Sequence, residues 1–88
     1  MITPETLLDY KWEAVHQNKW RWRYQWNEYR HPLMMMSIRH ILKDNTYIMV
    51  FRGKRLSKPI RKMEELHEIY KVMMGSTMEK RSHKPWLM

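Results

Sequence analysis

The sequence predicts an α+β fold with a long N-terminal helix over 4–30, a three-stranded antiparallel sheet over 33–60, and an amphipathic helix over 61–74. Three observations support this order. Apolar residues recur at helical spacing in the first segment, β-branched and aromatic residues concentrate in the second, and helical spacing returns in the third. We therefore expect one small domain over 1–75, followed by a short basic tail over 76–88.

A helix is expected to begin near Pro4. Thr3 can cap the free backbone N–H groups, Pro4 suits the first helical position, and Glu5 suits the positive end of the helix. No Gly or Pro follows until the His31-Pro32 pair, where the residue before proline is pushed away from helical geometry. At about 100° per residue, one apolar stripe contains Leu7, Leu8, Ala14, Val15, Trp22, Trp26 and Tyr29.

The segment KWRWRYQW, residues 19–26, also fits a strand. Period-two alternation would place its aromatic residues on one face and its basic residues on the other. The helix is favoured because the apolar stripe runs unbroken from Leu7, but both interpretations stay open. In the helix, Trp20 and Tyr24 lie opposite the stripe and need another element to cover them.

Strand signals follow Pro32. In 33–42, Met34, Met36, Ile38, His40 and Leu42 share one side. We interpret His40 as a half-buried structural residue. Lys43-Asp44-Asn45 is turn chemistry, and 46–52 has the β-branched and aromatic content of a central strand. A tight turn at Gly53-Lys54 leads into a third strand over 55–60, and Pro59 favours an edge position for it.

The helix over 61–74 buries Met63, Leu66, Ile69, Tyr70 and Met73 and exposes its charged residues. Gly75 is placed to end it. The polar tail after Gly75 should be disordered unless it contacts the body of the protein or a partner.

The net charge of +8 is concentrated in the middle of the chain. Residues 19–62 hold twelve Lys or Arg and only two acidic residues, which predicts attraction to a polyanion. No apolar run is long enough to span a membrane, and the N-terminus lacks the features of a secretory signal. We therefore expect a cytoplasmic protein without a membrane partner.

Nothing in the sequence indicates catalysis. The five His residues have no metal-ligand spacing, Cys is absent, and two Gly residues cannot form a glycine-rich phosphate loop. Glu64, Glu65, His67 and Glu68 are interpreted as an exposed helix face rather than a catalytic cluster. The expectation is no enzyme activity, metal, cofactor or small-molecule substrate.

Residues 37–75, SIRHILKDNTYIMVFRGKRLSKPIRKMEELHEIYKVMMG, combine strand signals, a Gly-Lys turn, a basic segment and a helix that opens with paired acids. This order resembles the sheet-plus-helix DNA-binding domains of the AP2 type and the arm-binding domains of phage integrases. The glycine-rich first strand and the aromatic-Leu-Gly of the AP2 third strand are absent here. The resemblance implies a three-stranded sheet laid in the major groove of DNA with the helix on its back. Its contact positions correspond to Arg39, Arg52, Arg55, Ser57 and Lys58.

Independently of the resemblance, Ser37, Arg39, Arg55 and Ser57 share the polar face of the expected sheet. Arg side chains can read guanine edges, whereas Lys and Ser mostly hold the backbone. The candidate binding residues are Arg21, Arg23, Arg39, Arg52, Lys54, Arg55, Ser57 and Lys58, with Trp20, Tyr24 and Trp86 as aromatic contacts. These aromatic residues suit either stacking on unpaired bases or packing against a protein.

Two functions fit these features, and a third, a structural subunit of an RNA-protein assembly, shares features of both. The first is a small basic protein of phage or mobile-element origin that binds nucleic acid, with duplex DNA favoured, through the polar face of its sheet. The second is a non-enzymatic interaction protein, an effector, inhibitor or complex subunit, that docks its basic, aromatic and Met-rich surface on an acidic patch of a larger enzyme. The Met34-Met35-Met36 run suits either a core strand or such a surface.

Overall fold

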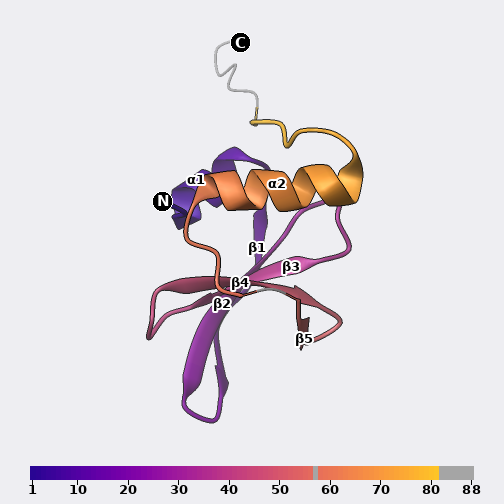
Figure 1. Cartoon of the computed structure of the whole chain (residues 1–88). Helices are drawn as coiled ribbons and strands as arrows, with labels where there is room; N and C mark the ends of the chain where they lie inside the picture. Colours follow the sequence, from indigo (N-terminus) through magenta and orange to yellow (C-terminus); the bar gives the residue numbers. More distant parts are fainter. Residues whose placement is uncertain (57, 82–88) are drawn as a thin grey trace.

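The computed structural model describes residues 1–56 and 58–81. In chain order its elements are α1 (Pro4–Asp9), β1 (Glu13–Arg21), β2 (Tyr24–Arg30), β3 (Ser37–Ile41), β4 (Thr46–Phe51), β5 (Lys54–Arg55) and α2 (Met63–Met74). The five strands form one antiparallel sheet in the order β1-β2-β3-β4-β5, so each strand pairs with the one before it (Figure 1).

The prediction of a long N-terminal helix over 4–30 is wrong. The helix begins as expected, with the Thr6 N–H donating to Thr3 Oγ1 at 3.2 Å, but α1 ends at Asp9. Lys11 then takes a left-handed conformation at φ 73° and Trp12 enters the core with no exposed surface. Val15, a member of the predicted stripe, is 39% exposed. Helical periodicity was present, but pairing with β3 gives residues 24–30 hydrogen-bond partners and burial that an isolated helix could not supply.

The predicted three-stranded sheet is therefore five-stranded. Residues 19–26 are neither one helix nor one strand, because the chain reverses at Trp22 and Arg23 between β1 and β2. Arg21 pairs with Tyr24, and Trp20 pairs with Gln25. Paired residues share a face of the sheet, so Trp20 and Tyr24 lie on opposite faces.

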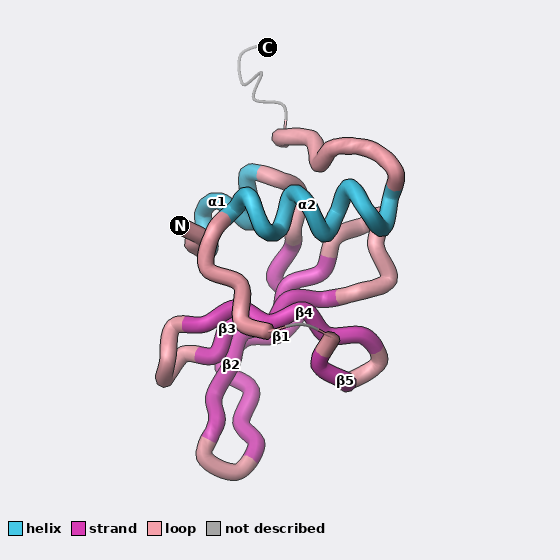
Figure 2. The backbone as a smooth tube through the Cα atoms, viewed as in Figure 1, coloured by secondary structure: helices cyan, strands magenta, loops and turns pink. Residues whose placement is uncertain are grey.

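One face of the sheet, here called the covered face, packs against α2. Its residues Tyr29, Ile38 and Met49 join Leu66 and Tyr70 of α2 in the hydrophobic core. Figure 2 shows both helices on this side of the sheet. The alternate residues of β2, β3 and β4 form the opposite face, here called the open face.

The β1-β2 hairpin projects from the body on the side away from α2 (Figure 1). All nine residues of β1 are exposed. The hairpin contains a bulge at Asn18, which has a φ of 55° and lies at a register shift. Its N–H donates to Asn27 Oδ1 at 2.8 Å and its Oδ1 accepts from Gln25 Nε2 at 3.2 Å, so the bulge is tied to β2.

The later elements agree with the sequence in kind and differ in their bounds. The first predicted strand begins at Ser37 rather than 33, and the third is reduced to Lys54–Arg55 plus a bridge between Tyr47 and Ile60. The predicted turn at Gly53-Lys54 lies one residue earlier, at Arg52 and Gly53, with φ of 51° and 79°. The helix ends at Gly75 in a left-handed conformation, as predicted.

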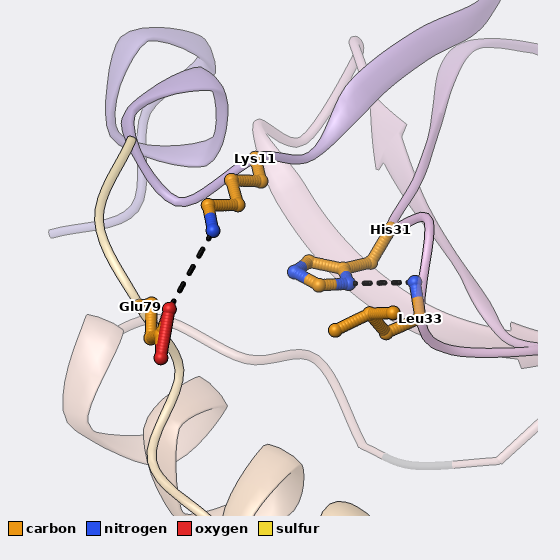
Figure 3. Close-up of polar contacts among 4 residues, drawn as sticks. All are labelled: Lys11, His31, Leu33 and Glu79. Atoms are coloured by element: carbon orange, nitrogen blue, oxygen red, sulfur yellow. Dashed lines mark hydrogen bonds and ion pairs between the residues drawn. The ribbon is translucent and has the colours of Figure 1, made fainter. Parts of the chain in front are cut away.

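After Gly75 the chain returns across the covered side. Met78 is buried, and Trp12 Nε1 donates to Met78 Sδ at 3.3 Å. Lys11 Nζ lies 3.6 Å from a carboxylate oxygen of Glu79, as Figure 3 shows. The backbone contacts α1 again where the Arg81 N–H donates to the Asp9 carbonyl. The first residues of the predicted tail thus contact the body of the protein.

Neither helix in the described part of the chain has the length and hydrophobicity needed to cross a bilayer.

Candidate nucleic-acid interface

The open face is hollowed beside the turn end of the hairpin, and the hollow has a volume of about 430 Å³. Three arginines and three aromatic residues line it: Arg21, Arg39, Arg55, Trp22, Tyr24 and Trp26. Apolar side chains, including Ile41 and Ile48, contribute to its wall, and Asp44 is the acidic residue of the lining. We call this site the aromatic-arginine hollow.

Strand register brings these residues together. Trp26 pairs with Ile41, and Arg39 pairs with both Glu28 on one side and Ile48 on the other. Next to the hairpin turn, Arg21 pairs with Tyr24, which lies on the same face of β2 as Trp26. Residues from all five strands therefore meet, although they extend in the sequence from Arg21 to Pro59.

Arg39 is held in place within the hollow. Its Nε donates to Glu28 Oε1 at 3.0 Å, and its guanidinium carbon lies 4.7 Å from the centroid of the Trp26 ring. Glu28 is only 9% exposed, so its carboxylate depends on this partner. The ion pair and the cation–π contact hold the guanidinium over the indole.

The three aromatic residues differ in exposure. Trp22 is 89% exposed and Tyr24 is 52% exposed, whereas Trp26 is partly buried beneath Arg39. Trp22 has a φ of 59°, a left-handed conformation in which a bulky residue is an outlier. The rim of the hollow is therefore aromatic and accessible, and its inner part is formed by Arg39 and Trp26 in contact with each other.

The structure brings four of the predicted site residues into the hollow: Arg21, Tyr24, Arg39 and Arg55. Ser37 shares their face but is buried at 8% exposure. Ser57 and Trp86 lie outside the described residues.

The other predicted residues lie elsewhere. Arg52 is in the β4-β5 turn with its guanidinium 5.2 Å from the Phe51 ring centroid, and Lys54 pairs with Phe51 on the covered face. Trp20 is exposed on the other face of the hairpin. Arg23 is exposed in the hairpin turn, and Lys58 is exposed in the bend after β5.

Trp22 and Trp26 were missed as site residues, since helical periodicity assigned them to a buried stripe. The period-two alternation of residues 19–26 was a signal for Trp26 on an open strand face. Trp22 had no comparable signal, because two-residue hairpin turns favour Gly, Asn and Asp.

Two buried histidines lie on the covered side. Trp12 and Tyr70 flank His31 with T-shaped ring contacts, and His31 Nδ1 accepts from the Leu33 N–H at 3.1 Å (Figure 3). Burial, and next the charge of Lys11, lower the pKa of His31 below its ordinary 6.5. This ring is therefore neutral at physiological pH and packs in the core between Trp12 and Tyr70.

His40 is 8% exposed, so it is buried rather than half-buried as predicted. Its Nε2 lies 2.7 Å from Asn45 Oδ1, and its ring stacks on Tyr47 with centroids 4.2 Å apart. Burial raises the pKa of Tyr47 to about 12. In residues 1–56 and 58–81 no group of His, Asp or Glu side chains is arranged to hold a metal ion.

Residues 37–75 hold three strands followed by a helix, the order that suggested AP2-type domains, but two further strands extend the same sheet. Kinship with that family stays a prediction. No family model, curated protein or solved structure matches the chain.

Proposed function

We propose that this protein binds nucleic acid through the open face of its sheet. The observation that carries the proposal is the aromatic-arginine hollow, where Arg21, Arg39 and Arg55 gather with three aromatic residues. Arginine is the preferred partner of phosphate groups and base edges, and aromatic rings stack on bases.

The charge around the hollow supports the same conclusion. Lys19 and Arg23 lie on the hairpin close to Arg21, and neither helix of the described residues covers this side of the sheet. The acidic residues of α2, Glu64, Glu65 and Glu68, belong to the layer on the opposite side. A polyanion approaching the open face therefore meets a field of predominantly positive sign.

The test is a fluorescence-anisotropy titration of labelled DNA and RNA at two salt concentrations. We expect the affinity to fall steeply with salt, because arginines that neutralise phosphates release counterions. The variant Arg21→Gln with Arg55→Gln should weaken binding about tenfold or more. Its matched control is Arg52→Gln with Arg61→Gln, which removes the same charge outside the hollow and should have a smaller effect.

Equal losses from the two double variants would show that net charge alone drives binding, without a site on the open face. Absence of binding to any nucleic acid at low salt would contradict the proposal altogether.

A second candidate function, a protein-interaction module, is favoured by one observation. An apolar groove of about 440 Å³ lies near the end of α2, and its exposed lining residues are Leu33, Met35, Leu56, Met73 and Met74. Methionine side chains adapt to varied partner shapes. Arg52 and Lys71 neighbour the lining residues in sequence, so the partner that fits is an apolar segment flanked by acidic residues.

Peptide display with the whole protein as bait tests this second function. We expect enrichment of apolar peptides with flanking acids, and loss of that enrichment in the variant Met35→Glu with Met73→Glu. Selection of the same peptides by both proteins would exclude the groove as the binding site.

A further inference from the structure

We infer that the aromatic-arginine hollow accepts unpaired nucleobases, so that the protein binds single-stranded nucleic acid in preference to duplex. This inference rests on the proposed function and narrows its ligand class. It departs from the duplex preference that the sequence suggested, and the shape of the site is the reason.

The hollow combines aromatic and aliphatic side chains with its arginines. Its wall includes Ile41 and Ile48, and its rim carries Trp22 and Tyr24. In a duplex the bases are stacked on their neighbours and only their edges face the grooves. Aromatic side chains recognise the flat faces of bases, which are accessible in single strands, loops and bulges.

The projecting β1-β2 hairpin is a two-stranded ribbon that can enter the major groove of a duplex, but β3, β4 and β5 contribute to the site from beside it. Here the residues of the site are recessed between the hairpin and the main part of the sheet, in a volume of about 430 Å³. That volume lies within the range of about 300–1,000 Å³ found for small-molecule sites. A base can enter such a space only when it has left the stack.

Trp22 supplies independent support. Its indole is 89% exposed, so it adds nothing to the core, and its φ of 59° is disfavoured for a bulky side chain. Gly or Asn at this turn position would avoid the strain. A strained residue without a packing role indicates a function at that position, and an exposed indole between Arg21 and Arg23 is suited to stacking on a base.

The inner part of the hollow is preorganised for the same purpose. The guanidinium of Arg39 already lies on the Trp26 ring at 4.7 Å and is fixed by Glu28. A base that enters the hollow would stack on the guanidinium of Arg39 and on an aromatic residue of the rim. Arg21 and Arg55 then lie close enough in the same lining to contact the adjoining phosphates.

The experiment compares one labelled 12-nucleotide strand, free and annealed to its complement, in anisotropy titrations with the whole protein. We expect tighter binding of the free strand, together with quenching of tryptophan fluorescence. Trp22→Ala should weaken single-strand binding about 5- to 150-fold, the loss expected for one stacked base. Trp20→Ala is the matched control, since Trp20 is also exposed but lies on the other face of the hairpin.

The outcomes separate this inference from the proposed function. Equal or tighter duplex binding, with Trp22→Ala and Trp20→Ala alike in effect, would overturn the inference and leave nucleic-acid binding intact. Failure to bind either probe would contradict the proposed function itself. Thermal melts check that the variants fold, and Trp22→Gly, which suits the left-handed turn, serves as the second variant.

Discussion

The guanidinium of Arg39 lies over the indole of Trp26, 4.7 Å from the ring centroid. The same side chain neutralises Glu28, whose carboxylate is 3.0 Å from its Nε and largely buried. Arg39 was predicted as a ligand-binding residue, and the structure gives it a second role in holding the open face together. Its removal therefore affects stability as well as binding.

We expect Arg39→Ala to lower the free energy of unfolding by about 1–3 kcal/mol, because it leaves a buried carboxylate without its partner. Urea denaturation measures the change. Combining Arg39→Ala with Glu28→Gln should recover part of the loss, since the amide carries no charge. A double-mutant cycle with no coupling between the two positions would show that the ion pair is not important for stability.

Trp22→Gly should stabilise the fold. Relief of the left-handed strain, about 1–2 kcal/mol, outweighs the greater chain entropy of glycine, about 0.5–1 kcal/mol. The matched opposite change is Gly53→Ala, because Gly53 also has a positive φ and no atom lies within 4 Å of the added Cβ. Its cost is therefore a backbone effect alone. Urea midpoints that move in the same direction for both variants would contradict this account.

His31 makes stability depend on pH. Because the folded pKa is lower than 6.5, the unfolded chain takes up a proton that the folded chain resists as the pH falls below 6.5. The contribution of His31 to stability is thus complete above pH 6.5 and is lost as the pH falls from there toward the folded pKa. We expect the urea midpoint to fall between pH 7.5 and pH 5.

The variant His31→Gln should reduce this pH dependence, although it also lowers stability at neutral pH by disturbing the contacts with Trp12 and Tyr70. His16→Gln removes an exposed histidine and is the control. An unchanged slope of stability against pH in His31→Gln would show that another group is responsible.

Local signals in the sequence predicted the second half of the fold better than the first. Asp44 and Asn45, Gly53 and Gly75 mark turns through their own backbone preferences, so β3, β4 and α2 were found near their true positions. Residues 19–26 fit both a helix and a strand by periodicity, and the pairing of β2 with β3, which lies further along the chain, decides between them. Arg39 and Arg55 were placed on one face correctly, because local turn signals define the strands that carry them. Their position beside Trp22 and Trp26 was not predicted, because it depends on the β1-β2 hairpin.

Met78 tests where the folded unit ends. The sequence placed the domain boundary at Gly75, yet Met78 is 5% exposed, and its Sδ accepts the hydrogen bond from Trp12 Nε1. We expect Met78→Ala to lower the free energy of unfolding by about 2–5 kcal/mol, because it opens a cavity beside Trp12 and removes the partner of a buried N–H. Met35→Ala, a truncation of a side chain that is 80% exposed, should change it by no more than about 0.5 kcal/mol. Similar small effects from both variants would place the domain boundary at Gly75. A large effect of Met78→Ala alone would extend the domain to Met78, because the core around Trp12 is complete only when Met78 packs on it.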